Sequence, residues 1–341
     1  MNIENEYSVF NGWLSTEDIP PLSDELAVGW SGGADSTALL LALKAHGYRV
    51  QAWHVDHGWR HSSSDEAARL AEKAAGWKIP FISACLREPS NMPGGASSTR
   101  NSEAEARKGR YAQFQRWSRE SGLTTLCLAH HRDDQAETVY MRLLQGAGPA
   151  GCRGMWRERQ MDGLRIVRPL LHLSGQQLRQ ALVLAGIDWF EDPSNADMSI
   201  WRNRIRHQLF PAMEKSGVSP DKLFLRWQHQ ADRVARSLDE VTDSLLNNLS
   251  KTGQNGICLP WQAWKDVSPA VRARLLQKLM VQLLGEGVTP GRRHILLIES
   301  WTKRNGRGGL DLSRCRLYRE FDRLHLQPAS AGFACKNRAV A

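Results

Sequence analysis

The sequence predicts an α/β protein whose N-terminal part is an open, mainly parallel sheet with helices on both faces. Three short apolar runs have the length of buried strands: LAVGW at 26–30, YRVQAWHV at 48–55 and TTLCLAH at 124–130. Segments with helical period separate these runs, and alternating strands and helices build parallel sheets. A smaller, mainly helical domain and a basic C-terminal tail are expected to follow.

Amphipathic segments between the predicted strands supply the crossover helices. STALLLALKAHG at 36–47 has helical period and ends at Gly47, a residue type that often terminates helices. DEAARLAEKAAG and, later, SEAEARKGRYAQFQRWSRESG predict two further helices. Because open α/β sheets bind ligands at the carboxyl ends of their strands, we look for the functional site where the apolar runs end.

The sequence changes character near the end of its second third. EKSGVSPD at 214–221 interrupts the pattern, and helical period resumes over 223–250. We therefore predict a catalytic domain over 1–215 and a C-terminal helical and basic region over 220–341, with one long closing helix of the first domain as the alternative. From residue 292 onward, eleven Lys and Arg stand against four Asp and Glu.

The composition narrows the class of protein. With 341 residues, 41% of them hydrophobic and 24% charged, the chain is long enough for two globular domains. A net charge of +9 makes nucleic acid a candidate partner, although many basic proteins bind none. There is no apolar leader and no run of 18 apolar residues, so a cytoplasmic location without membrane contact is expected. The six cysteines contain no C-x-x-C pair and are assigned no chemical role.

The first candidate site is the string SGGADS, which lies between the first predicted strand and the first predicted helix. Consecutive N–H groups at the start of a helix can hold an anion, and the hydroxyls of Ser31 and Ser36 can donate to phosphate. Asp35 would repel phosphate unless a divalent cation lay between them, which predicts Mg²⁺. An ordinary Gly-rich turn with a capping side chain is the alternative for this string alone.

The string AHHRDDQAET follows the third predicted strand and is the second candidate site. On a helix His130 and Asp134 would share one face with Glu137 or Thr138. Asp134 is then placed to share a cation with Asp35, and His130 to contact phosphate or assist proton transfer. A charged first turn that compensates the helix dipole is the simpler interpretation of this string by itself.

Taken together, the motifs resemble the tRNA(Ile)-lysidine synthetases of the N-type ATP pyrophosphatase, or PP-loop, superfamily. SGGADS resembles the superfamily loop, AHHRDDQAET resembles the family's AHHxDDQAET, and HVDHGWR resembles an HVDHGLR-type segment with Trp59 replacing an aliphatic residue. SEAEARKGRY is similar to the ExxARxxRY helix, and residues 146–155 are similar to G-x-G-x-x-G-x-x-G-M with Cys152 as a departure. RPLL, DPSN and RNRIR complete the order, so that the resemblance covers roughly residues 26–211.

The resemblance implies an adenine nucleotide alpha hydrolase-like fold and a ligase that joins lysine to C2 of the wobble cytidine of a CAU-anticodon tRNA(Ile). The cytidine would first be adenylated by ATP, with loss of pyrophosphate, and free L-lysine would then displace AMP. Mg²⁺ is the implied metal. The oligomeric state stays open, with a homodimer as one option.

The resemblance also assigns roles to individual residues. Catalytic roles are implied for Asp35, His130, Asp134 and Arg110, with Asp35 and Asp134 as the metal ligands. Contacts with ATP are implied for Ser31, Gly32, Gly33, Ala34, Asp35, Ser36, Val55 and His57. Contacts with lysine or tRNA are expected for Arg107, Arg202 and Arg206. The helical and basic region over 220–341 is expected to bind the body of the tRNA.

Three other functions stay open from the sequence. A tRNA thiolase also adenylates a base, but it commonly needs a C-x-x-C pair, which this sequence lacks. An amidating enzyme similar to GMP or NAD synthetases would not need the HHxDDQAET string. A non-catalytic RNA-binding protein could retain the fold, although the complete SGGADS loop with Asp35 and the presence of Asp134 disfavour it.

Overall fold

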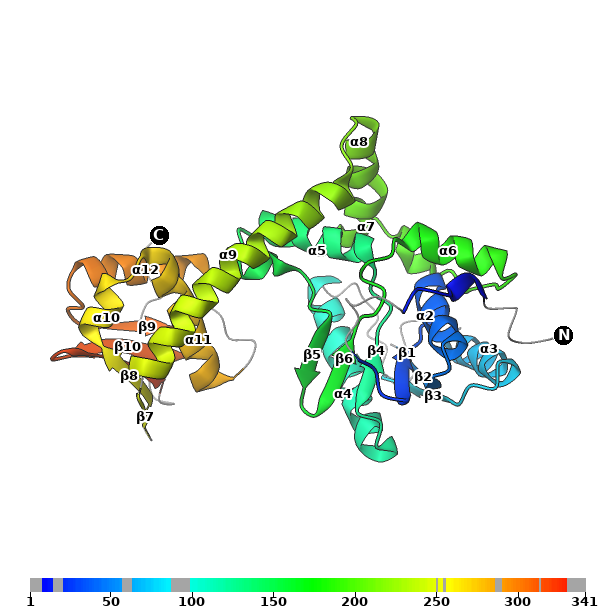
Figure 1. Ribbon diagram of the computed structural model, residues 1–341, viewed down its shortest axis with the longest axis horizontal. Coiled ribbons are helices and arrows are strands. Elements are labelled where there is room, and N and C mark those ends of the chain that lie inside the picture. The colour runs from blue at the N-terminus through cyan, green and yellow to red at the C-terminus, as the bar shows by residue number, and fades with distance from the viewer. Residues whose placement is uncertain are drawn as a thin grey trace. The chain divides into compact units, whose positions relative to one another are not determined.

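The fold is described by a computed structural model that divides into two compact units (Figure 1). Unit 1 comprises residues 1–144 and 154–228, and unit 2 comprises residues 145–153 and 229–341. No helix in the described part of the chain is long and apolar enough to cross a membrane. The structure describes residues 8–14, 21–56, 63–86, 99–249, 251–253, 256–285, 290–312 and 314–329.

Unit 1 is built on a six-stranded sheet in the order β3-β2-β1-β4-β6-β5. All neighbouring strands pair in parallel except β5 and β6, which are antiparallel. The predicted open, mainly parallel sheet is confirmed, and it contains β3, β5 and β6 in addition to the three predicted strands. The strands are β1 (Glu25–Gly29), β2 (Arg49–Asp56), β3 (Phe81–Cys85), β4 (Thr125–Cys127), β5 (Glu158–Met161) and β6 (Leu164–Val167).

Helices cover both faces of this sheet, as predicted. Leu26 and Val28 of β1 point to one face, where they share a core with α2, α3 and α6. Ala27 points to the opposite face, which α4 covers with Phe114 and Trp117. This alternation follows from the period of two along a strand. The helices are α2 (Ala34–Ala45), α3 (Ser63–Gly76), α4 (Thr99–Ser121) and α6 (Gly175–Leu184).

A third group of helices in unit 1 packs around α5. Its small core contains Val139 of α5 and Phe224 of α9, and the ring of Phe224 stacks on Phe210 with centroids 5.6 Å apart. A π-helical turn connects α7 to α8, a feature that often accompanies functional sites. The segments are α5 (Arg132–Leu144), α7 (Trp201–Arg204), the π-turn (Ile205–Leu209), α8 (Phe210–Lys215) and α9 (Pro220–Leu249), with short 3₁₀ turns at Ser8–Phe10, Gly151–Arg153 and Pro193–Ala196.

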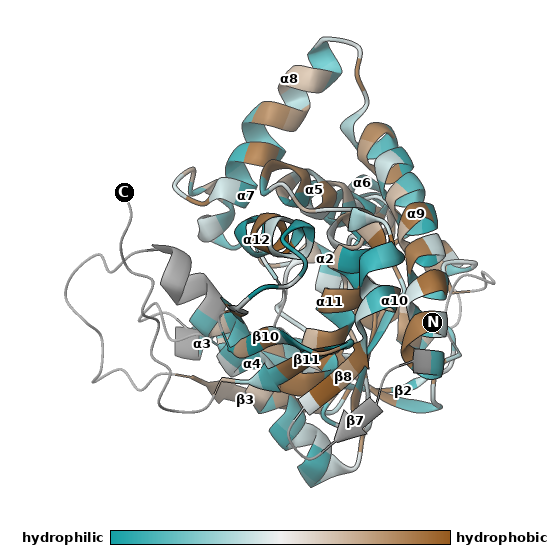
Figure 2. Ribbon diagram, turned by 90° about the vertical axis from the view of Figure 1, so that its left-hand side faces the viewer, coloured by the Kyte–Doolittle hydropathy of each residue, from teal (hydrophilic) through white to brown (hydrophobic). Residues whose placement is uncertain are grey.

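Unit 2 contains the expected helices and also a five-stranded antiparallel sheet that we did not predict, in the order β7-β8-β11-β10-β9. Trp264 and Trp301 are fully buried in its core. Much of the basic stretch expected as a tail is folded into α12 and β9 to β11. Helix α9 carries both apolar and polar residues along its length (Figure 2). The elements are β7 (Lys251–Gly253), β8 (Gly256–Pro260), α10 (Trp261–Asp266), α11 (Pro269–Leu284), α12 (Arg292–Lys303), β9 (Gly309–Leu312), β10 (Cys315–Glu320) and β11 (Arg323–Pro328).

Candidate active site

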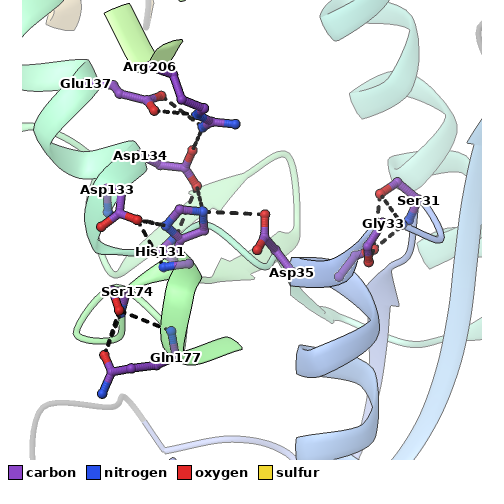
Figure 3. Close-up of polar contacts among 12 residues, drawn as sticks. Ser31, Gly33, Asp35, His131, Asp133, Asp134, Glu137, Ser174, Gln177 and Arg206 are labelled. Atoms are coloured by element: carbon purple, nitrogen blue, oxygen red, sulfur yellow. Dashed lines mark hydrogen bonds and ion pairs between the residues drawn. The ribbon is translucent and has the colours of Figure 1, made fainter. Parts of the chain in front are cut away.

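The SGGADS loop connects β1 to α2, where its hydroxyls and the helix N-terminus lie together (Figure 3). The Oγ atoms of Ser31 and Ser36 are 3.1 Å apart, and Ser36 Oγ donates to the carbonyl oxygen of Gly33 over 3.1 Å. Gly33 is the N-cap of α2, and no side chain caps the helix there. The first N–H groups of α2 therefore lack the side-chain acceptor that usually satisfies them, which suits an anionic ligand.

Position 32 of this loop favours glycine. Its φ of +81° lies in the left-handed region, and a Cβ there would stand 2.6 Å from Leu70 Cδ2 of α3. Its carbonyl oxygen accepts hydrogen bonds from the N–H of Phe190 at 2.9 Å and from Thr37 Oγ1 at 3.3 Å. The loop is thus held tightly against α3 and the segment after α6.

Two carboxylates from different elements meet at His131, an almost fully buried residue (Figure 3). His131 Nε2 lies 3.4 Å from Asp35 Oδ2 of α2 and 3.5 Å from Asp134 Oδ2 of α5. Burial would lower the pKa of His131, but its hydrogen bond to Asp35 and the charge of Asp134 raise this pKa above its ordinary value. The raised pKa reflects the acidic side chains that surround this imidazole.

The position of His130 corrects the sequence analysis. Because α5 begins at Arg132, His130 lies in the loop before the helix and does not share a helical face with Asp134. Burial, together with nearby arginines, lowers the pKa of His130 to about 3 against the opposing effect of Asp134, so its imidazole is neutral. Its Nδ1 atom is buried and has no hydrogen-bond partner among the described residues.

Arg202 and Arg206, expected at the substrate, bind two acidic side chains of α5. Glu137, 1% exposed, accepts from Arg202 Nε at 2.6 Å and from Arg206 Nε at 2.7 Å. Asp134 Oδ1 lies 3.2 Å from Arg202 Nη2 and 3.0 Å from Arg206 Nη2. Burial would raise the pKa of Asp134, but His131 and these arginines lower it to about 2. Asp134 is therefore ionised.

A cavity of about 210 Å³ in unit 1 brings most of the predicted site residues together. The SGGADS loop forms one wall and α4 contributes another, with Arg107 and Arg110 on it. His57 lies outside the described residues. The predicted residues that line the cavity are Ser31, Asp35, Ser36, Val55, Arg107, Arg110, His130 and Asp134, and the other lining residues are Gly29, Trp30, Trp53, Tyr111, Phe114, Leu128 and Ala129.

Two residues that organise the site were not singled out from the sequence. The sequence analysis assigned a role to His130 and none to His131, although the pair of histidines in AHHRDDQAET could have drawn attention to both. Gln135 is buried, and its amide holds the main chain of Met155, accepting from the N–H at 2.6 Å and donating to the carbonyl oxygen at 3.0 Å. Its place next to Asp134 was the only hint of this role in the sequence.

The carboxylates fit Mg²⁺ in part. Asp35 Oδ1 is buried without a hydrogen-bond partner among the described residues. Asp35 and Asp134 both lie within 3.5 Å of His131 Nε2, so the two carboxylates are close to each other and offer the oxygen ligands that Mg²⁺ prefers. The described residues form no group of three or more His, Cys, Asp or Glu that could hold a metal by themselves. Any metal held here would need further ligands from a substrate or from water.

Comparisons with known proteins agree with this arrangement. The family model described as PP-loop domain matches residues 14–213. A tRNA(Ile)-lysidine synthase of Chlamydia muridarum (strain MoPn / Nigg) is 34% identical over 233 residues, which cover 66% of this chain and 71% of that protein. A tRNA(Ile)-lysidine synthase of Polaromonas naphthalenivorans (strain CJ2) is 30% identical over 315 residues, which cover 88% of this chain and 91% of that protein. The chain belongs to the tRNA(Ile)-lysidine synthase family.

A third member of the tRNA(Ile)-lysidine synthase family matches over a shorter stretch. The enzyme of Chlamydia pneumoniae is 38% identical over 185 residues, 54% of this chain. That alignment spans 56% of the Chlamydia pneumoniae protein, little more than half of its length. The match to the PP-loop domain, over residues 14–213, includes the SGGADS loop, His131 and the residues that line the cavity.

Proposed function

We propose that the chain ligates L-lysine to C2 of the wobble cytidine of a CAU-anticodon tRNA(Ile), with ATP as the second substrate. The observation that carries the proposal is the convergence of the SGGADS loop, the carboxylates of Asp35 and Asp134 and the α4 arginines on one cavity. The family membership supports the choice of tRNA and lysine as the other substrates. Because ATP and tRNA are cytoplasmic substrates, the proposal includes a cytoplasmic location.

The first chemical step is adenylation of the cytidine. The C2 carbonyl oxygen attacks the α-phosphorus of ATP, and the bond to pyrophosphate breaks. Ser31, Ser36 and the N–H groups of residues 32–34 would bind phosphate oxygens, and Val55 would contact the adenine. Asp35 and Asp134 would hold Mg²⁺, which when bound offsets the charge on the phosphates.

The second step transfers lysine. The ε-amine attacks C2, the C–O bond to AMP breaks, and the amine loses a proton. Nucleophilic attack requires the neutral amine, so a base or a desolvated pocket must favour deprotonation. With a pKa of about 3, His130 is too weak a base for that proton, but its neutral imidazole lines the cavity and could hydrogen-bond a phosphate oxygen. Arg110 lines the same cavity and could bind the departing phosphate.

Product analysis tests this function against its rivals. The protein is incubated with ATP labelled at the α-phosphate, Mg²⁺ and a CAU-anticodon tRNA(Ile) transcript, with and without L-lysine, and a methionine tRNA with the same anticodon serves as the control. With the isoleucine tRNA we expect one AMP and one pyrophosphate for each lysidine formed. With the methionine tRNA we expect none of these products. AMP without lysine transfer would favour a thiolase-like enzyme, ADP would contradict PP-loop chemistry, and RNA binding without turnover would favour a non-catalytic protein.

A further inference from the structure

Trp156 is a large aromatic side chain that the fold leaves at the surface of unit 1. It is 53% exposed and lies in the irregular segment between the Gly151–Arg153 turn and β5. A single exposed apolar side chain is common and needs no explanation by itself. Trp156 differs from such a residue because side chains of the catalytic unit hold its main chain in place.

Hydrogen bonds fix three consecutive residues of this segment. The amide of Gln135 accepts from the N–H of Met155 at 2.6 Å and donates to its carbonyl oxygen at 3.0 Å. Arg168, 5% exposed, donates from Nη1 to the carbonyl oxygen of Trp156 at 2.7 Å. The main-chain N–H of Arg168 donates to the carbonyl oxygen of Arg157 at 2.8 Å. Because the segment is already ordered, a ligand that binds Trp156 loses little affinity to the ordering of this loop.

Gly154 shows how closely the segment fits against α5. Its φ is +73°, and a Cβ at this position would stand 2.7 Å from Gln135 Oε1. A larger residue would therefore push away the amide that holds Met155. The course of the chain into Trp156 thus depends on both the glycine and the glutamine.

The residues that hold Trp156 are neighbours of residues that line the cavity. Arg168 directly follows β6, and the residue before it accepts a hydrogen bond at 2.9 Å from the N–H of Leu128, which lines the cavity. Gln135 directly follows Asp134, which lines the same cavity. Strands β5 and β6 lie side by side here (Figure 1). Trp156 is therefore placed beside the cavity and is not among its lining residues.

The residues that follow Trp156 are basic. Arg157 and Arg159 flank a single acid, Glu158, and Arg165 Nε binds that acid at 2.8 Å. An aromatic ring beside arginines is the combination with which proteins stack on unpaired bases and bind the adjoining phosphates. The surroundings of Trp156 thus suit single-stranded RNA.

We infer that the ring of Trp156 stacks on a nucleotide next to the wobble cytidine of the tRNA, an assignment that rests on the proposed function. In the proposed reaction the wobble base leaves its stack to reach the cavity, so each neighbouring base loses a stacking partner. An aromatic ring held beside the cavity replaces that partner. Trp156 binds the anticodon loop in this way and takes no part in the chemical steps.

Trp156→Ala and Trp156→Phe test this inference, with Leu184→Ala as the control for loss of an exposed apolar side chain from unit 1. The Kd for a CAU-anticodon tRNA(Ile) and the KM values for tRNA, ATP and lysine are measured for each full-length variant at one salt concentration. We expect Trp156→Ala to raise the Kd and the KM for tRNA about 5- to 100-fold, the range for one lost base–aromatic stack. Trp156→Phe should stay within about threefold of wild type, and Leu184→Ala within about twofold. The KM values for ATP and lysine should change by less than about twofold.

A tRNA with an abasic nucleotide before or after the wobble position separates stacking from other contacts. At the contacted position, loss of the base should weaken binding to wild type and leave binding to Trp156→Ala within about twofold, because the stack is already absent. Equal losses for wild type and variant at both positions would overturn the inference.

Two further outcomes would also overturn it. One is a Trp156→Ala enzyme whose Kd for tRNA is unchanged. The other is an unchanged Kd together with a change in oligomeric state, which would point to a second copy of the chain at Trp156. If wild type binds the tRNA but transfers no lysine, the proposed function fails, and the comparison of Kd values still decides the role of Trp156.

Discussion

His131 joins two carboxylates that the sequence separates by almost a hundred residues. Asp35 follows the first strand and Asp134 follows the fourth, and both approach Nε2 of the same imidazole. Two carboxylates this close repel each other unless a cation lies between them. In the structure the imidazole of His131 contacts both carboxylates, and its raised pKa is the electrostatic consequence.

Replacement of His131 tests this role at the residue scale. His131→Gln keeps a hydrogen-bond donor but removes the ring that can take up a proton between the two carboxylates, so we expect the rate of lysine transfer to fall by about 100-fold, as for a positioned catalytic group. His229→Gln, on the exposed face of α9, is the matched control and should keep its activity. A His131→Gln enzyme within twofold of wild type would contradict the role.

The SGGADS turn shows how far a motif predicts structure at the scale of an element. The string between a strand and a helix predicted a turn followed by an open helix N-terminus, and the structure has this turn, with a positive φ at Gly32 and no side-chain cap on α2. That the turn binds phosphate stays a prediction. The same reasoning misplaced His130, because nothing in AHHRDDQAET marks where the helix begins. The loop before α5 is set by a tertiary contact, the hydrogen bond from Arg132 N–H to the carbonyl oxygen of Leu173.

Gly32→Ala tests the loop, with Gly47→Ala as its matched control. Both glycines have φ near +80°, but a Cβ at Gly47 meets nothing within 4 Å, whereas at Gly32 it meets Leu70 at 2.6 Å. We expect Gly47→Ala to cost about 1 kcal/mol of unfolding free energy from backbone strain and Gly32→Ala about 2 kcal/mol or more. Denaturant unfolding measures both. Equal costs would show that the contact with α3 is unimportant.

In unit 2, Asp239 of α9 forms ion pairs with three basic side chains. It lies 2.8 Å from Arg153, 2.6 Å from Arg274 and 2.9 Å from Lys278. Burial would raise the pKa of Asp239, but hydrogen bonds from Lys278 and Arg274 lower it below its ordinary value. A lowered folded-state pKa means that the stabilisation is complete above the unfolded pKa, near 4, and is lost as the pH falls through the folded value.

Asp239→Asn should therefore lower the Tm of the full chain most at pH 7, and the difference from wild type should shrink below about pH 4. Thermal unfolding over this pH range measures the effect. Asp311→Asn, at an exposed position on β9, is the control and should lower the Tm far less. A difference between wild type and Asp239→Asn that did not change with pH would show that the charge of Asp239 is not what stabilises the unit.

For the whole molecule, the sequence predicted the strands and helices of unit 1 better than those of unit 2. Apolar runs such as LAVGW are buried on both faces and are therefore easy to recognise as strands. The strands of unit 2, such as CRLYRE and RLHLQP, alternate apolar and charged residues, so that their many arginines made them look like a soluble tail. Nor could composition indicate that Arg202 and Arg206 bind Glu137, because that contact depends on how α7 and the π-turn lie against α5.

The charge of the whole molecule leads to a prediction about RNA binding. With 45 Lys and Arg against 36 Asp and Glu, we expect the affinity for tRNA to fall linearly with salt on logarithmic axes, because phosphate contacts release counterions. The double variant Arg292→Gln and Arg293→Gln, two exposed residues at the start of α12, should reduce the slope by about one to two. Filter binding between about 50 and 200 mM salt measures it. An unchanged slope would contradict a role for α12 in RNA binding.

The central claim is that the carboxylates at His131 serve an ATP-dependent transfer of lysine to tRNA. The most direct measurement follows labelled lysine into a CAU-anticodon tRNA(Ile) with ATP and Mg²⁺, for wild type, Asp35→Asn and the exposed control Asp188→Asn. We predict incorporation by wild type and Asp188→Asn, and a loss of about 100-fold or more for Asp35→Asn. Incorporation by all three at similar rates would contradict the role of Asp35, and no incorporation by wild type would contradict the function itself.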